Sequence, residues 1–302
     1  MHVVVAGSSG FLGQALVREL RARDHRVTRL VRSASDEPDT SVWAPYDGTV
    51  DAALVGSADV VVNLAGSPTM GNPHSKKWAT ELRRSRITTT ALLARTIADA
   101  ERSPAFLAGN GISFYGDHRD AGDPVLTESA DSRGDALLTD VTREWQDAAQ
   151  AAVDAGARVC FLRTAPVLDR ASAPLNLLLP LFRLGGAAKL GDGRQHFPVI
   201  SLRDWVGGVA HLAEHDTALG AFNLCCPEVP TNAEFTKVLA ELVRRPAFLR
   251  VPSPLIRFGA GRMAPEVLGS LRTRPEALEQ AGYLFHDHDI RDVLTTALAP
   301  TT

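Results

Sequence analysis

Three glycines that directly follow an apolar run form a pattern able to hold a diphosphate. The run HVVVA occupies residues 2–6, and Gly7, Gly10 and Gly13 follow it within GSSGFLG. Glycine lets the backbone turn tightly and come close to a pyrophosphate, whose charge is then stabilised by the N-terminal amides of the next helix. Because the turn follows a strand of buried type, it predicts a dinucleotide site; the alternative is a turn that only packs a helix on a sheet.

The residues after the second apolar run indicate which dinucleotide is bound. This run, Arg26–Val31, is followed by Arg32 and Ser33 and not by an acidic residue. Sites for NAD usually place an acid here to bind the ribose 2′-hydroxyl, whereas an arginine suits the 2′-phosphate of NADP. The pattern therefore favours NADP(H), with Arg32 as the phosphate ligand. Arg29 is a second candidate that strand alternation would turn away, and a solvated strand end is the other interpretation of Arg32.

Strand-like and helical patterns alternate through the first half of the chain. The expected strands are His2–Ala6, Arg26–Val31, Asp59–Leu64, Ala105–Asn110 and Arg158–Arg163. The helices expected between them are Phe11–Arg23, Lys76–Ala100 and Ser132–Ala155. Continuous apolar strands that alternate with helices predict an α/β fold with a Rossmann-type doubly wound parallel sheet.

The pattern changes after Arg163 and predicts a smaller α+β substrate lobe. Helices are expected at Ala173–Leu184, Asp204–His215 and Thr231–Arg244, strands at Gly220–Cys226 and Phe248–Pro252, and a mostly helical tail over Pro275–Leu298. We expect residues 1–165 to form the cofactor domain and 166–302 the substrate lobe, with segments near 200–226 returning to the first domain.

Composition excludes several classes of partner. The chain has 302 residues and a net charge of -3, with 45% hydrophobic and 22% charged residues, which is ordinary for a soluble globular protein. It has no clustered basic charge for nucleic acid and no long apolar span for a membrane. The three cysteines, Cys160, Cys225 and Cys226, have no metal-binding spacing. We expect a cytoplasmic protein without disulfides.

Polar groups that could do chemistry follow the strand ends, where such sheets bind ligands. Ser113 and Tyr115 lie in GNGISFYG at residues 109–116, and a tyrosine there could act as an acid or simply pack with a satisfied hydroxyl. His196 follows Arg194 and Gln195, which could bind an anionic or polyhydroxylated substrate or form a surface hairpin. His286 and His288 more simply lie in an exposed turn, so no metal site is expected.

Taken together, these segments resemble the extended short-chain dehydrogenase/reductase superfamily. The resemblance rests on GSSGFLG, on NLAG, on a strand ending in S-x-Y-G and on LRT at Leu162–Thr164. PLFRLGGAAKLGDG at Pro180–Gly193, the segment Gly220–Pro246 and the AGYLF ending narrow it to the nucleoside-diphosphate-sugar epimerase-like family, which has a C-terminal domain of unknown function. It covers nearly the whole chain, but the physiological substrates of that family are largely unassigned.

The resemblance implies a set of NADP(H) contacts along the chain. The matching segments are the glycine turn, the residue after the second strand, the loop after NLAG, a Ser-Arg pair on the long helix and the loop after LRT. The residues expected to contact the cofactor are Gly7, Ser9, Gly10, Phe11, Leu12, Gly13, Arg32, Leu64, Ala65, Gly66, Arg86, Asn110, Pro166 and Val167.

The tyrosine and lysine that short-chain dehydrogenases use for proton transfer are missing. The pair normally lies four residues apart on one helical face. Approximate alignment places Leu137 and Val141 at these positions, and neither transfers a proton. Ser113 lies two residues beyond the usual serine position. The candidate catalytic residues are therefore Tyr115, Ser113 and His196.

These features predict an NADP(H)-dependent oxidoreductase or epimerase that acts on a small polar metabolite. Whether net redox turnover occurs stays open, since the missing pair also suits a non-redox NADP(H)-binding sensor or scaffold. A redox-neutral lyase or cyclase on the same scaffold is a further alternative. The resemblance also suggests a homodimer formed through the long helices.

Overall fold

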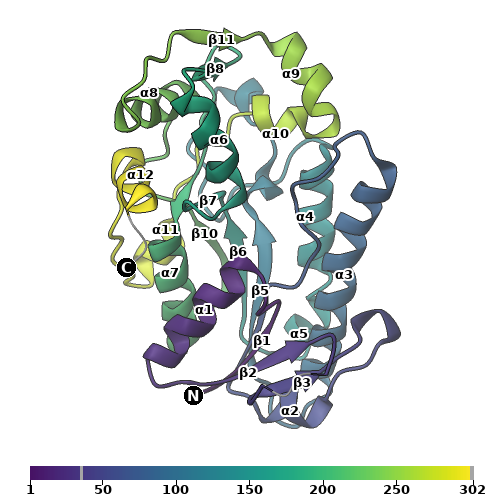
Figure 1. Ribbon diagram of the computed structural model, residues 1–302. Coiled ribbons are helices and arrows are strands. Elements are labelled where there is room, and N and C mark those ends of the chain that lie inside the picture. The colour runs from purple at the N-terminus through teal and green to yellow at the C-terminus, as the bar shows by residue number, and fades with distance from the viewer. Residues whose placement is uncertain (35–36, 300–302) are drawn as a thin grey trace.

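A parallel sheet forms the centre of the protein, as the sequence predicts, and it has seven strands, of which β3 (Thr40–Val42) was not predicted. The computed structural model describes residues 1–34 and 37–299. The strands lie in the order β10-β6-β5-β4-β1-β2-β3 (Figure 1). Their bounds are β1 His2–Ala6, β2 Arg26–Val31, β3 Thr40–Val42, β4 Val60–Asn63, β5 Ala105–Gly111, β6 Val159–Thr164 and β10 Gly220–Leu224. The order reverses direction between β1 and β4, and ligands bind at such a switch point.

Helices cover both faces of this sheet (Figure 1). One face packs against α1 (Phe11–Ala22) and α7 (Leu202–Glu214), and the other against α2 (Ala52–Ser57), α3 (Lys76–Ala98), α4 (Leu137–Asp147) and α5 (Gln150–Asp154). Val3 and Val5 point to the first layer while Val4 and Ala6 point to the second. Strands buried on both faces explain the continuous apolar runs of the sequence, so the predicted Rossmann-type fold is confirmed.

The C-terminal region is built from short helices and two small parallel sheets. The two sheets pair β8 (Ala188–Leu190) with β11 (Leu249–Val251) and β7 (Val167–Leu168) with β9 (Ile200–Ser201). The helices are α6 Ala173–Arg183, α8 Asn232–Leu242, α9 Ser253–Ala260, α10 Ala264–Leu268, α11 Glu276–Gln280 and α12 Ile290–Leu298. Short 3-10 turns, η1 Pro45–Asp47, η2 Ile112–Tyr115, η3 Arg119–Ala121 and η4 Gly261–Met263, complete the elements. The division of the chain at residue 165 stays a prediction.

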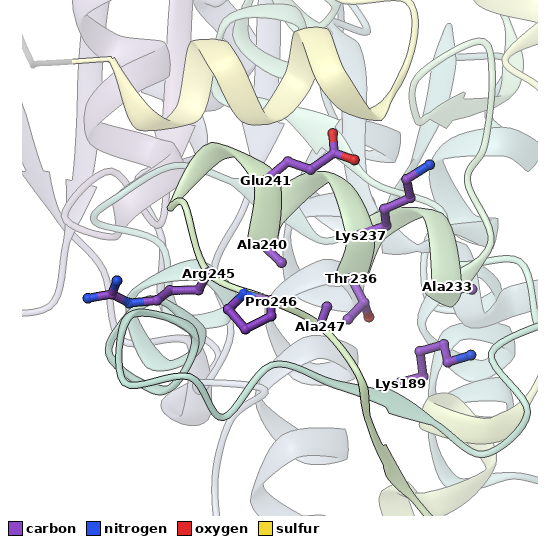
Figure 2. A pocket seen from close by; sticks show the side chains of 9 residues that line it. All are labelled: Lys189, Ala233, Thr236, Lys237, Ala240, Glu241, Arg245, Pro246 and Ala247. Atoms are coloured by element: carbon purple, nitrogen blue, oxygen red, sulfur yellow. The ribbon is translucent and has the colours of Figure 1, made fainter.

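A shallow cavity of about 400 Å³ lies in this region between α8 and β8. Figure 2 shows α8 along one side of it and the chain from Arg245 to Ala247 along the other. Lys189, Lys237 and Glu241 are its charged lining residues in addition to Arg245. None of the side chains predicted to do chemistry lines this cavity.

One of the predicted helices is wrong in extent. The helix expected over Ser132–Ala155 begins only at Leu137, because Ser132 and Arg133 bond to the backbone carbonyls of Phe114 and Tyr115. It is also interrupted between α4 and α5. The tail, expected to be mostly helical over Pro275–Leu298, forms α11 and α12, with an irregular segment between them.

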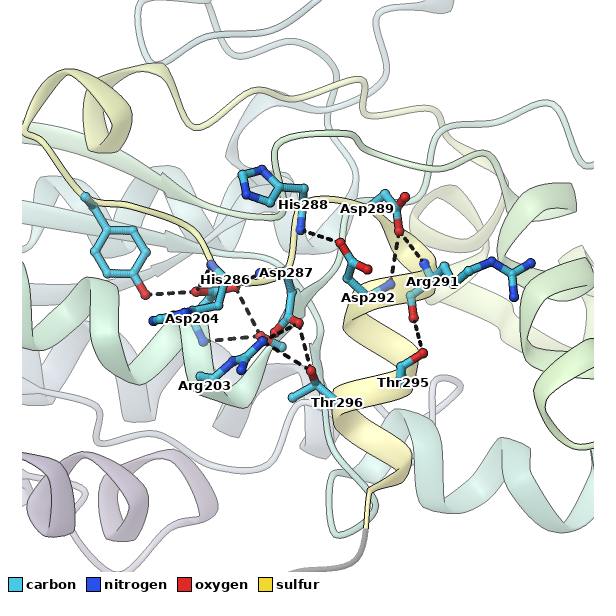
Figure 3. A network of polar contacts seen from close by, with 12 residues as sticks. Arg203, Asp204, His286, Asp287, His288, Asp289, Arg291, Asp292, Thr295 and Thr296 are labelled. Atoms are coloured by element: carbon cyan, nitrogen blue, oxygen red, sulfur yellow. Dashed lines mark hydrogen bonds and ion pairs between the residues drawn. The ribbon is translucent and has the colours of Figure 1, made fainter.

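The irregular segment in the tail is held by the buried carboxylate of Asp204. Its Oδ1 accepts a hydrogen bond from the hydroxyl of Tyr283 at 2.9 Å and from the amide of His286 at 2.9 Å, and its Oδ2 accepts from the amide of Asp287 at 2.8 Å. Arg203 pairs with Asp287 at 2.6 Å (Figure 3). The amides of His286 and Asp287 bond to Asp204 and not to carbonyls of a preceding helical turn, so this stretch is irregular between α11 and α12.

Two classes of site lack support in the part of the chain that the structure describes. No helix there combines the length and the apolar character needed to cross a membrane. No group of three or more His, Cys, Asp or Glu side chains there is arranged to hold a metal ion. His286 and His288 contribute backbone amides to the tail network.

Candidate functional site

The glycine turn between β1 and α1 has the geometry of an anion-binding site. Gly7 has a φ of +78°, and a Cβ added there would lie 2.5 Å from the carbonyl carbon of Leu64. A Cβ added to Gly13 would lie 2.2 Å from the oxygen of Gly7. Gly10 caps α1 without a side chain, and the first turn of α1 has no acidic residue. The N-terminal amides of α1 are therefore without a side-chain cap and suit a phosphate.

The structure separates the two arginines that could bind a 2′-phosphate. Arg29 is engaged by Glu37, with 2.6 Å between Nη2 and Oε2. Arg32 is exposed and has no hydrogen bond or ion pair within residues 1–34 and 37–299. Its positive charge opposes the rise in the pKa of Tyr46 that burial and Glu81 cause, and Arg84 covers the ring of Tyr46 at 4.4 Å. Arg32 is the better placed of the two to receive an anion.

The loop after β4 is fastened to α3 by the Ser-Arg pair. The amide of Ser67 donates to Ser85 Oγ at 2.9 Å, and Arg86 Nη1 donates to the carbonyl of Ser67 at 3.1 Å. Arg86 pairs with no carboxylate among the residues described, and burial lowers its pKa to about 10. These contacts hold Leu64, Ala65 and Gly66 beside the glycine turn, and no counter-ion to Arg86 lies among the described residues.

Asn110 and the loop after β6 form the opposite border of the site. Asn110 is buried, with its amide nitrogen 3.2 Å from the carbonyl of Thr142 in α4. Pro166 accepts a hydrogen bond from the amide of Ile200 at 3.2 Å, and Val167 is buried in β7. The structure thus fixes this loop at the carboxyl end of the sheet, and contact with a cofactor stays a prediction for these residues.

Tyr115 is placed as a packing residue, which is one of the two roles that the sequence left open. Its side chain is fully buried, and its hydroxyl donates to Asn223 Oδ1 at 2.6 Å while Arg163 Nη1 donates to it at 2.8 Å. Burial raises the pKa of Tyr115 to about 12. Arg163 also covers the ring of Phe114 at 3.6 Å. A hydroxyl that is enclosed and already bonded twice is unsuited to receive a substrate proton.

The predicted substrate residues in the C-terminal region have different surroundings. Gln195 is buried, and its amide nitrogen donates to the carbonyls of Leu190 at 3.1 Å and Val267 at 3.3 Å. His196 Nδ1 lies 2.8 Å from Asp123 Oδ2. Arg194 is exposed. Gln195 therefore ties β8 to α10, and the structure does not bring Arg194 and Gln195 into one binding surface.

A polar cavity of about 190 Å³ lies next to Gln195 and contains three arginines that sequence reasoning missed. Arg119, Arg250 and Arg257 line it together with Asp192. Arg119 is paired with Asp117 at 2.6 Å, and Arg250 Nε donates to the carbonyl of Gly191 at 2.5 Å. The three arginines come from separate segments, so no local sequence pattern could have grouped them.

A half-buried carboxylate beside Ser113 was also missed. Ser113 Oγ donates to Glu266 Oε2 at 2.7 Å, and the two residues are separated by 153 positions in the sequence. Glu266 Oε1 is buried without a hydrogen-bond partner among the described residues. Burial raises the pKa of Glu266, while the Ser113 hydroxyl and the Leu138 amide oppose this rise. Glu266 lies in the short segment APEVL, where nothing in the sequence marks it as functional.

Comparison with known proteins agrees with this geometry. Residues 3–225 match the profile described as the NAD dependent epimerase/dehydratase family. The chain belongs to this family. Residues 251–297 match a separate profile, the domain of unknown function DUF1731, which runs from the last residue of β11 through α9, α10 and α11 to all but the last residue of α12. The family and the C-terminal domain that the sequence resembles are therefore confirmed.

Several relatives cover almost all of this chain. The epimerase family protein Mb2239 of Mycobacterium bovis is 37% identical over 97% of this chain and 96% of its own length. A crystal structure of human SDR39U1 with NADPH has a TM-score of 0.87 and 28% identity, covering 98% of this chain and 99% of the human one. A nucleoside-diphosphate sugar epimerase from Corynebacterium glutamicum is 33% identical with a TM-score of 0.78, covering 99% of this chain and 58% of the other.

Proposed function

We propose that this epimerase-family member binds NADP(H) and acts as an oxidoreductase or epimerase on a small polar metabolite that carries an anionic group. The observation that carries the proposal is the glycine turn. The backbone packs closely at Gly7 and Gly13, where a side chain would not fit, and the first amides of α1 have no side-chain cap, so they are open to a diphosphate. When bound, the nicotinamide supplies hydride transfer to or from a substrate carbon. Human SDR39U1, a relative of the same length, was crystallised with NADPH.

The choice of NADP(H) over NAD(H) rests on Arg32. Its guanidinium is exposed next to the strand that follows α1 and has no partner within the described residues. An arginine at this position suits a 2′-phosphate, because the planar guanidinium donates two parallel hydrogen bonds to phosphate oxygens. Arg29 is already engaged by Glu37, which leaves Arg32 as the proposed ligand.

An anionic substrate is supported by the cavity that contains Arg119, Arg250 and Arg257. Arg119 is already paired with Asp117, but Arg250 and Arg257 outnumber the single aspartate of the lining and favour a phosphate or carboxylate group there. A nucleoside diphosphate sugar is one substrate of this class, and the name of the Corynebacterium relative refers to that class. The buried, free cysteines fit a reducing compartment such as the cytoplasm, and a homodimer through the long helices stays part of the proposal.

A second candidate function is NADP(H) binding without redox turnover. It is favoured by Leu137 and Val141, which occupy the positions of the usual tyrosine and lysine, and Val141 is buried. A redox-neutral lyase or cyclase has no specific observation in its favour. The sensor and the enzyme share the cofactor site and differ only in hydride transfer.

Calorimetric titration of the purified protein with NADPH and with NADH tests the shared part of the proposal. We expect NADPH to bind more tightly than NADH, and absence of NADPH binding would overturn the proposed function. NADPH deuterated at C4 of the nicotinamide then separates the two candidates. Transfer of the label into any metabolite supports the enzyme, whereas tight binding without transfer from a broad metabolite extract supports the sensor.

A further inference from the structure

We propose that Ser113 and Glu266 form a proton-handling pair that replaces the missing tyrosine and lysine of this fold. The inference rests on the proposed function, because it assigns a role in the same site. It concerns residues of two different parts of the chain. Ser113 belongs to η2, which follows β5 of the central sheet, and Glu266 belongs to α10 of the C-terminal region.

The position of the pair fits the role. Helix α4 begins at Leu137, the position where the tyrosine would stand. The amide of Leu138, the next residue, opposes the rise in the pKa of the Glu266 carboxyl that burial causes. Figure 1 shows α10 over the end of α4, and η4, which precedes α10, packs against α4. The carboxylate therefore reaches from α10 to the beginning of the helix that lacks its own proton donor.

The environment of Glu266 is costly for a residue with only a structural role. A buried carboxylate needs partners for both oxygens, yet Oε1 has none among the described residues. The arginines of this region do not stabilise the Glu266 carboxylate. Arg119 is paired with Asp117, Arg143 is paired with Asp140 of α4, and Arg262 of η4 is exposed. A glutamine would keep the hydrogen bond from Ser113 and would avoid the cost of burying a charge. The chain instead has an ionisable side chain at a position where a neutral one would make the fold more stable.

The proposed step balances as follows. In the oxidative direction a hydride leaves the carbinol carbon for the oxidised nicotinamide, and the carbon–oxygen double bond forms. The hydroxyl proton passes to Ser113 Oγ, whose own proton moves to Glu266. In the reductive direction neutral Glu266 returns the proton by the same route. The hydrogen bond of 2.7 Å between Ser113 Oγ and Glu266 Oε2 is the segment of this route that the structure contains.

The first test uses stability and needs no substrate. A carboxyl whose folded pKa is raised stabilises the fold at low pH and loses that contribution as pH rises through the folded pKa. We therefore expect E266Q to raise Tm relative to wild type, with a larger gain at pH 8 than at pH 4.5. The exposed Glu276 supplies the matched control E276Q, which is expected to leave Tm unchanged. A lower Tm of E266Q at both pH values would show a purely structural role and overturn the proposal.

The second test uses phenanthrenequinone as a carbonyl probe with NADPH. E266Q and S113A are each expected to lower kcat by about tenfold or more while changing the Kd of NADPH less than twofold. Unchanged kcat in E266Q overturns the pair, as does wild-type protein that binds NADPH yet reduces no quinone. Wild-type protein that binds no NADPH overturns the proposed function instead, and the stability measurement then still reports the ionisation of Glu266.

Discussion

Tyr283 donates a hydrogen bond of 2.9 Å to the fully buried Asp204, and this contact joins the tail of the chain to the first turn of α7. Burial and the charge of Asp204 raise the pKa of Tyr283. Two backbone amides and the hydroxyl of Ser201 also donate hydrogen bonds to Asp204. A single carboxylate thus fixes the segment that leads into α12, the last helix packed on the C-terminal core.

We predict that D204A destabilises the protein by about 3 kcal/mol or more, because hydrogen bonds to a charged group contribute roughly 1.5 to 3 kcal/mol each and are not additive. Y283F removes one of these bonds and is expected to cost about 1.5 kcal/mol. Urea unfolding monitored by tryptophan fluorescence measures both. Equal stabilities of D204A and wild type would contradict the proposed anchoring of the tail.

The same contact explains a limit of prediction from sequence. The tail Pro275–Leu298 is mostly helical as expected, but the break between α11 and α12 is not visible in the sequence, because Asp204, far away in the chain, binds the amides of His286 and Asp287 there. The helix expected at Thr231–Arg244, by contrast, is formed, and it begins with a capping box of Thr231 and Glu234 whose partners lie within one turn. Local patterns were decisive where the partners are local and misleading where a distant side chain competes.

The candidate site divides in the same way. The glycine turn and Arg32 follow directly on predicted strands, so their positions could be derived from spacing. The Ser113–Glu266 contact spans 153 residues, and the arginine cavity combines three segments, so no spacing could reveal them. Tyr115 stood at the expected strand end, but its burial depends on Arg163 and Asn223 of neighbouring strands.

The glycine turn provides the second prediction. G13A is expected to weaken NADPH binding by about tenfold or more, because the new Cβ would lie 2.2 Å from the oxygen of Gly7 and displace the turn. G259A is the matched control, since a Cβ at Gly259 in α9 meets no atom within 4 Å. Calorimetric titration with NADPH measures both. Unaltered affinity in G13A would exclude this turn as the diphosphate site.

Arg32 provides a test of cofactor choice. R32Q is expected to weaken NADPH about tenfold or more and to leave NADH nearly unchanged, because only NADPH carries the 2′-phosphate that a charged hydrogen bond would hold. The matched control is R29Q, which removes an arginine of the same strand region that is paired with Glu37. If R29Q and not R32Q shifts the ratio of the two Kd values, the assignment of the phosphate ligand is wrong.

Tyr115 should matter for stability and not for chemistry. Y115F leaves the buried Asn223 Oδ1 without its donor and is expected to destabilise the protein by about 1 to 3 kcal/mol. With a pKa of about 12, the phenol stays neutral in the ordinary pH range, so its loss should leave the pH dependence of NADPH-linked turnover unchanged. Loss of turnover at unchanged stability would restore Tyr115 as a catalytic candidate.

The arginine cavity gives the last prediction. With the cofactor site saturated by NADPH, pyrophosphate is expected to raise the Tm of wild type, because Arg119, Arg250 and Arg257 present guanidinium donors to one space. The double variant R250Q/R257Q should lose most of this shift, since Arg119 remains engaged by Asp117. R262Q removes an exposed arginine outside the cavity and should keep the shift. Equal shifts in all three proteins would mean that pyrophosphate binds elsewhere. The anionic group of the proposed substrate would then have no binding position in the protein.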